Sequence, residues 1–163
     1  MDNKYPHDLD AERAVLGAAL LSKIPIDHID SILRFDDTNW FYEHKHNVLW
    51  SAIIDLHESG KPIDQILLLG KLGTEWITFF ADLVNSVPAS ANMEHYAETV
   101  REIYERRQVI AKASQAVGQA SNKRTPLYEA VESLESVVAD HKPAMVDEID
   151  DEIIDPGPIP EDL

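Results

Sequence analysis

His44, His46 and His57 are the side chains of this sequence best suited to coordinating a metal ion. A zinc site needs three or four ligands directed at one point. His44 and His46 are two residues apart, so on a helix their side chains would point about 200° away from each other. The chain contains no cysteine that could complete a site. We therefore interpret these histidines as capping and packing residues and predict no metal site.

Catalytic motifs are also absent from the sequence. Serine, histidine and aspartate occur, but no nucleophile motif surrounds them, and the paired carboxylates lie in runs typical of solvated faces. The phosphate-binding pattern G-x-x-x-x-G-K-[ST] does not occur, so nothing in the chain predicts ATP hydrolysis. We predict that this chain is not an enzyme, has no catalytic residues and binds no cofactor.

The charge balance limits the kinds of partner that the chain can bind. Acidic residues outnumber basic ones by 30 to 14, and the formal net charge is −16. Nucleic-acid binding depends on lysine and arginine to neutralise phosphates, so direct binding to DNA or RNA is not expected. A basic protein partner, or an interface without charge pairing, fits better. No apolar run is long enough to cross a membrane and residues 1–10 lack a signal peptide, so we expect a soluble cytoplasmic protein.

The longest helical pattern runs from Ser90 to Asn122. Apolar and aromatic residues recur there at intervals of three and four, which is typical of a helix that packs along one stripe. After a turn, Pro126 occupies the position of a first helical residue, with Thr125 as its cap. A second helix with the same spacing follows. We expect the two segments to form an antiparallel helical hairpin.

Two helices packed in this way each keep an uncovered apolar edge. We predict that these edges pair with a second copy of the chain, giving a dimer or a larger oligomer. The alternative is that the hairpin packs on the N-terminal half as ordinary core. The predicted interface residues are Tyr96, Val100, Ile103, Tyr104, Arg107, Ile110, Val117, Leu127, Val131, Leu134 and Val138.

Arg107 is the charged member of this set, and two interpretations of it are open. Its guanidinium could fix the register by reaching an acid across an oligomer interface. Its aliphatic stem could instead pack while the charged end reaches water. Three other basic residues lie close to Arg107 or in the turn after the long helix: Arg106, Lys123 and Arg124. We expect them to pair with neighbouring acids.

The N-terminal half reads as a small helical head. Helical patterns are expected at residues 10–21, 26–33, 40–59, 65–72 and 75–85. Asp8 and Asp64 suit N-caps, and Gly60 suits a helix end that needs a positive φ. Gly17 allows another helix to approach closely. No segment alternates with period two over the length of a strand, so the predicted class is all-α.

Three regions follow from this pattern. They are a helical globular head at residues 5–90, a helical hairpin at 91–141 and an acidic, proline-containing tail or linker at 142–163. The last region combines many like charges with several prolines, so we expect it to be disordered or extended. The chain is either cut from a longer protein or ends in a free acidic tail.

Several short motifs, in this order, resemble a known family. They are Leu9–Gly17 (LDAERAVLG), Phe41-Tyr42 followed by His46, Gly60–Asp64 (GKPID), Pro88–Asn92 (PASAN), and Tyr96-Ala97 followed by Val100–Glu102 (VRE). Together they are similar to the N-terminal domain of DnaB-type replicative DNA helicases, over roughly residues 6–141. The resemblance implies a helical head and a hairpin that pairs between subunits to build a collar on a hexameric ring. It also implies docking of primase or a helicase loader, and a bond from His46 to backbone across the head.

The resemblance leaves three functions open. The first is the oligomerisation and partner-docking domain of a DnaB-like helicase from a phage or bacterium, with its ATPase motor beyond Leu163. The second is a free-standing mimic of that domain that regulates a helicase, a loader or a primase. The third is the N-terminal part of a phage primase–helicase fusion, because the acidic segment is similar to the lead-in of some phage-type proteins. Whether the reading frame continues after Leu163 would separate the second function from the other two, and the sequence after Leu163 would separate the first from the third.

Overall fold

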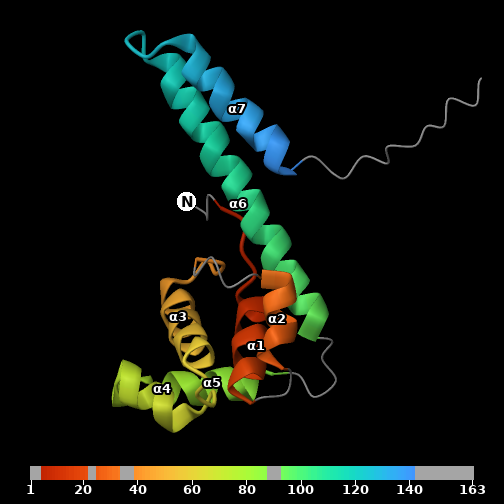
Figure 1. Cartoon of the computed structure of the whole chain (residues 1–163), viewed down its shortest axis with the longest axis vertical. Coiled ribbons are helices and arrows are strands. Elements are labelled where there is room, and N and C mark those ends of the chain that lie inside the picture. The colour runs from red at the N-terminus through yellow and green to blue at the C-terminus, as the bar shows by residue number, and fades with distance from the viewer. Residues whose placement is uncertain (1–4, 22–24, 34–38, 88–92, 142–163) are drawn as a thin grey trace, which may run out of the picture. The chain divides into compact units, whose positions relative to one another are not determined.

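The computed structural model describes residues 5–21, 25–33, 39–87 and 93–141 of the 163-residue chain (Figure 1). The acidic segment 142–163, with its predicted disorder, lies outside the described residues. The chain divides into two compact units, residues 1–111 and 112–163. We call the described part of the first the head unit, and residues 112–141 of the second the hairpin unit.

All regular secondary structure in the described ranges is helical, which confirms the predicted all-α class. The head unit also contains one short 3-10 helix, η1, and the long helix α6 belongs in part to each unit. The elements are α1 Leu9–Leu20, α2 Ile26–Leu33, α3 His44–Glu58, α4 Gln65–Leu72, η1 Thr74–Trp76, α5 Ile77–Ser86, α6 Met93–Ser121 and α7 Leu127–His141.

The starts of α3 and α5 differ from the sequence-based expectation by two residues or more. α3 was expected to begin at Trp40, but residues 41–43 are bent and the helix begins at His44. The bend is stabilised by side chains, because the backbone amide of Phe41 donates to Asn47 Oδ1 at 2.9 Å. The helix expected at residues 75–85 is divided into η1 and α5. The bend before α3 also depends on Glu12, which accepts from the amide of Tyr42 and lies 30 residues away in sequence, and local periodicity does not record such a partner.

Helix ends follow the predicted capping chemistry at several places. Asp8 accepts a hydrogen bond from the amide of Ala11, and Asp64 accepts from the amides of Ile66 and Leu67 at the start of α4. These carboxylates satisfy amides that have no partner inside the helix. Gly60 follows α3 with a φ of 67°, a value that glycine adopts readily. The caps therefore fix where α1, α3 and α4 begin or end.

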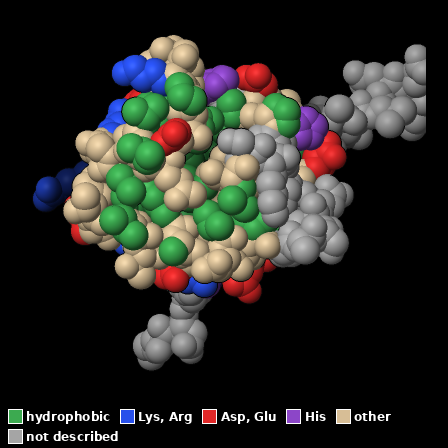
Figure 2. All heavy atoms as spheres, turned by 90° about the horizontal axis from the view of Figure 1, so that it is seen from below, with side chains coloured by type: hydrophobic (Ala, Val, Ile, Leu, Met, Phe, Trp, Pro, Cys, Tyr) green, Lys and Arg blue, Asp and Glu red, His purple; other side chains and the backbone are tan. Residues whose placement is uncertain are grey.

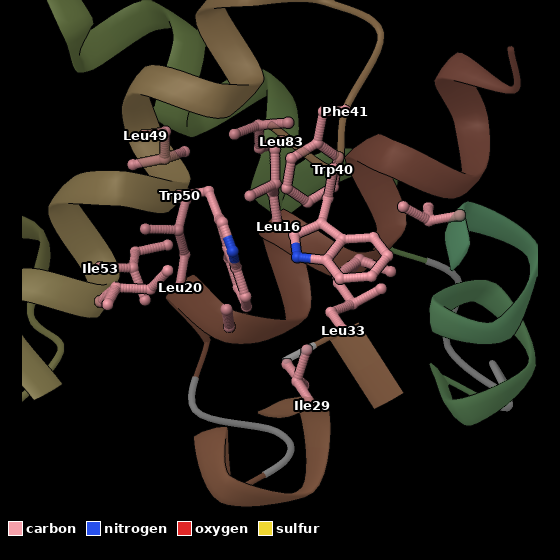
Figure 3. Close-up of a cluster of buried hydrophobic side chains, with 14 of the residues drawn as sticks. Leu16, Leu20, Ile29, Leu33, Trp40, Phe41, Leu49, Trp50, Ile53 and Leu83 are labelled. Carbon is pink, nitrogen blue, oxygen red and sulfur yellow. The ribbon is translucent and has the colours of Figure 1, made fainter. Parts of the chain in front are cut away.

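The core of the head unit is built around α1. Nine of its twelve residues are buried, and it packs against α3 and α5. Figure 3 shows Trp50 of α3 beside Leu20 of α1, within a cluster of aliphatic and aromatic side chains. Ala97 and Val100, from the first turns of α6, are 1% and 3% exposed in the same cluster. The first part of α6 therefore belongs to the core of the head unit.

Gly17 lies where α1 and α5 come closest. A Cβ atom on it would overlap the carbonyl oxygen of Leu83 and the side chain of Val87. The carbonyl belongs to the backbone of α5, so the two helices would have to separate to make room. The expected close approach at Gly17 is thus confirmed.

The substitution Gly17→Ala is expected to destabilise the head unit by about 1–3 kcal/mol, the usual effect of overpacking a core. Urea unfolding monitored by tryptophan fluorescence measures this, since all three tryptophans lie in the head unit. The matched control is Gly70→Ala in α4, where an added Cβ meets nothing within 4 Å. The control should hold or raise stability, because alanine favours helix more than glycine does. Equal midpoints for the two variants would contradict the account of Gly17.

The hairpin unit contains the end of α6 and all of α7, which run antiparallel and side by side (Figure 1). This confirms the predicted hairpin. Ser133 Oγ of α7 donates to Gln119 Oε1 of α6 at 2.8 Å. The turn is held by Asn122, whose side chain accepts from the amide of Arg124 at 3.1 Å. No cap from Thr125 is found among the described contacts, and α7 begins at Leu127, one residue after Pro126.

Candidate interaction surface

α7 presents a row of large apolar side chains to solvent. The exposed fractions are 70% for Leu127, 47% for Val131, 49% for Leu134 and 64% for Val138. These positions are spaced by four, three and four residues, so they lie on one face of the helix. We call these four residues the hairpin stripe. Val117, on α6, is exposed to a similar extent at 66%.

Small side chains make the contact between α6 and α7. Ala116 of α6 and Ala130 of α7 are each 3% exposed, and Ser133 is the α7 partner of Gln119. Val137 is partly buried on the same side of α7 as Ala130 and Ser133, whereas the four residues of the hairpin stripe are exposed beside this inner contact. An apolar stripe of this kind gains free energy when it is covered, at about 25 cal/mol for each Å² removed from water. The hairpin unit leaves this gain unrealised.

Tyr128 is an exposed aromatic residue next to the hairpin stripe. It is 67% exposed and is not among the predicted interface residues, because the predicted row begins at the neighbouring Leu127. Tyrosine is well suited to interfaces, since it combines a large apolar ring with a polar hydroxyl. A search for exposed aromatics on predicted helices would have found it.

Three of the predicted interface residues belong to the head unit's packing. Val100 is buried in the core, and Tyr96 and Tyr104 pack against that core while partly buried. The ring of Tyr104 lies 4.4 Å from that of Trp40, centroid to centroid. Two further predicted residues, Ile103 and Ile110, are partly exposed members of the same unit. The four residues of the hairpin stripe therefore lie together in the hairpin unit, and these five predicted residues lie in the head unit.

Arg107 follows neither of the two interpretations left open by the sequence. Its guanidinium donates to the carbonyl of Trp40 at 2.5 Å and to that of Pro6 at 3.2 Å. Burial lowers the pKa of Arg107, and the negative charge of Glu12 opposes this effect. The guanidinium thus joins α6 to two loop segments within the head unit.

Replacing Arg107 by Ala is expected to destabilise the head unit by about 1–3 kcal/mol, because two carbonyls lose a charged donor. Urea unfolding monitored by tryptophan fluorescence measures the loss. Arg106→Ala is the matched control, since Arg106 is exposed and pairs only with Glu102 at 2.6 Å in the described residues. A pair of this kind contributes about 0.3–0.5 kcal/mol. If both variants unfold at the same midpoint, the carbonyl contacts do not stabilise the head.

The polar centre of the head unit is a buried pair that sequence reasoning missed. Glu12 and His46 are each 2% exposed, and Glu12 Oε2 lies 2.6 Å from His46 Nδ1. The other carboxylate oxygen of Glu12 accepts from the amide of Tyr42 at 2.7 Å. The expected bond from His46 to the backbone is therefore wrong, because a carboxylate takes that place. Glu12 lies in the first turn of α1, where an acid is favourable at a helix start, and its spacing from Val15 and Leu16 also puts it on the apolar face.

The other histidines considered as metal ligands lie in different places. His44 is exposed at the start of α3, and His57 pairs with Asp27 at 3.1 Å. Within the described ranges, no three His, Cys, Asp or Glu residues come together in a way that could hold a metal ion. A depression of about 340 Å³ lies between α3 and α4, and its wall includes Asp55 and Lys71, which pair with each other. No described helix has the length and apolar character needed to cross a membrane.

Comparison with known proteins assigns this arrangement of helices to a family. Residues 4–102 match the DnaB-like helicase N terminal domain. The chain belongs to this family, and the resemblance inferred from the order of its motifs is confirmed. The crystal structure of the N-terminal domain of DnaB helicase from Mycobacterium tuberculosis superposes with a TM-score of 0.70 at 29% identity. That match covers 84% of this chain and 99% of the other.

Two curated relatives illustrate the extent of the similarity. Replicative DNA helicase DnaC of Bacillus subtilis (strain 168) is 32% identical over 108 residues, which are 62% of this chain and 23% of that protein. Replicative DNA helicase DnaB of Mycobacterium leprae (strain TN) is 30% identical over 144 residues, 83% of this chain and 23% of that protein. The chain thus spans less than a quarter of the length of these two relatives.

Proposed function

We propose that this chain is the N-terminal domain of a DnaB-type replicative helicase acting in DNA replication in the cytoplasm. In this proposal the domain does no chemistry itself. It assembles copies of the protein through the hairpin unit and offers docking surfaces to other replication proteins, such as a primase or a helicase loader. ATP hydrolysis and strand separation would reside in parts of the protein outside these 163 residues. Family membership supports the proposal.

The hairpin stripe is the observation that supports the assembly role best. Its four residues recur with the four-three-four spacing of a coiled-coil seam. Glu132 and Glu135 are exposed between them, so polar side chains flank the stripe. A hairpin that leaves four large apolar residues of α7 exposed on one face suits pairing with a second hairpin. A second copy of the chain brings an identical stripe, which allows a symmetric interface.

Sedimentation velocity of the full chain over a range of concentrations tests the proposal. We expect a dimer or a larger oligomer that dissociates on dilution. The association should persist in high salt, because the stripe is apolar and charge screening leaves burial of apolar surface intact. A chain that sediments as a monomer at every concentration reached would contradict the assembly role.

A further inference from the structure

α4 has an exposed apolar face that the head unit does not use. Leu68 faces inward and is fully buried, whereas Ile66 is 79% exposed and Leu67 is 40% exposed. At 100° per residue, Ile66 lies about 200° around α4 from Leu68, on the far side, and Leu67 lies about 100° from it. Figure 2 shows hydrophobic side chains gathered on the face of the molecule seen from below, the side on which α4 and α5 lie in Figure 1. Ile77 is also exposed, at 53%, but it belongs to α5 and not to α4.

Gly70 lies on the same face of α4, one turn after Ile66. A helix-interior glycine is less favourable than alanine, so it usually has a local reason. At Gly70 an added Cβ would meet nothing within 4 Å, and the residue does not have a positive φ. Packing within the described chain therefore does not require glycine here. Because Gly70 has no side chain, a partner's backbone could approach α4 closely beside Ile66 and Leu67.

The charges that flank α4 favour a basic occupant. Asp64 precedes the helix and Glu75 follows it, and both are exposed without a salt bridge among the described residues. Lys71, the basic residue of α4 itself, is already paired with Asp55. Lys61 lies three residues before Asp64 and contributes one opposing charge. In a symmetric pairing, a second copy of the chain would place its own Asp64 and Glu75 near these two acids, so local repulsion disfavours that occupant.

We propose that the α4 face, formed by Ile66, Leu67 and Gly70, is a docking site for an amphipathic helix of a basic partner protein. The partner helix places apolar residues on Ile66 and Leu67 and passes close to Gly70. Its lysine or arginine residues face Asp64 and Glu75. This site and the hairpin stripe consist of different residues in different units. The docking proposal can therefore be tested independently of hairpin pairing.

The test uses a fluorescently labelled amphipathic peptide with leucine at helical spacing and lysine at the other positions. Its anisotropy is measured while the full chain is added. The variants Ile66→Ser and Gly70→Leu keep the net charge of the chain, so general attraction for a basic peptide is unchanged. Each is expected to weaken binding by about tenfold or more, the usual loss when a central contact is removed. Gly70→Leu should also raise the midpoint of thermal unfolding, because leucine favours helix.

The matched controls remove exposed apolar side chains elsewhere. Ile77→Ser and Val138→Ser are expected to change binding by less than about twofold, as peripheral contacts do. A peptide with glutamate in place of lysine should not bind. If all four variants bind the lysine peptide equally, the α4 face is not the docking site. If Ile66→Ser instead reduces self-association of the chain, a second copy occupies the face and the proposal is overturned.

Discussion

A chain that carries Leu134→Asp and Val138→Asp is expected to sediment as a monomer at concentrations where the unmodified chain associates. Both positions belong to the hairpin stripe and are exposed, so the substitutions do not disturb the hairpin's own contacts. In a paired state each would place a carboxylate against apolar surface, without a counter-charge in the stripe. The dissociation constant should rise by at least about a hundredfold, because burying an unpaired charge costs several kcal/mol. Sedimentation velocity and circular dichroism measure association and helix content together.

The matched control is the pair Ser136→Asp and Ala139→Asp. These residues are also exposed on α7; Ser136 lies on the side of the helix opposite the stripe, and Ala139 lies about 110° around the helix from the centre of the stripe. The control adds the same two charges in the same part of the helix. If it dissociates the oligomer as strongly as the stripe variant does, then general repulsion and not the stripe explains the effect. If neither variant dissociates the oligomer, the copies associate through another surface.

The sequence alone indicates a different pair of substitutions, Ile103→Asp and Ile110→Asp, as the test of pairing. The structure shows why that pair is less informative. Both residues are partly buried and belong to the head unit, where a carboxylate would also affect stability. Loss of association would then have two explanations. The α7 positions avoid this because they are exposed within the hairpin unit.

Much of the fold could be predicted because its signals are local. Helix periodicity and capping residues depend on neighbours within one or two turns, and Asp8, Asp64 and Gly60 act as their types suggest. The bounds of α2 and α4 agree with the predicted ranges. The bend before α3 could not be predicted in this way. It depends on Glu12, which is distant in sequence.

The assignment of interface residues shows the same limit. Periodicity finds the apolar stripe of α6 but does not say what covers it. Val100 and Tyr104 are covered by the head unit's own core, whereas the α7 residues are not covered within the described chain. The carbonyl partners of Arg107 could not be predicted from its local sequence, because they lie 67 and 101 residues away. Whether copies pair through the exposed residues stays a prediction.

The substitution Glu12→Ala is expected to lower the free energy of unfolding of the head unit by about 2–4 kcal/mol. It removes the acceptor of the Tyr42 amide and of His46 Nδ1 at a site that is 2% exposed. It also leaves a cavity that the small methyl group does not fill. Urea unfolding followed by tryptophan fluorescence gives the change. Glu12→Gln should cost less, because its amide oxygen can still accept one of these hydrogen bonds.

Asp10→Ala is the matched control for Glu12→Ala, since Asp10 is an exposed acid in the same first turn of α1. Its loss is expected to cost at most about 1 kcal/mol through the helix dipole. A Glu12→Ala effect no larger than this would mean that the pair with His46 does not stabilise the head. A double-mutant cycle of Glu12→Ala with His46→Ala separates the energy of the Glu12–His46 interaction from the cost of the cavity. We expect an interaction energy of about 0.5–3 kcal/mol. Because the hairpin stripe lies in the other unit, Glu12→Ala should leave self-association intact while the head remains folded, the reverse of the stripe variant.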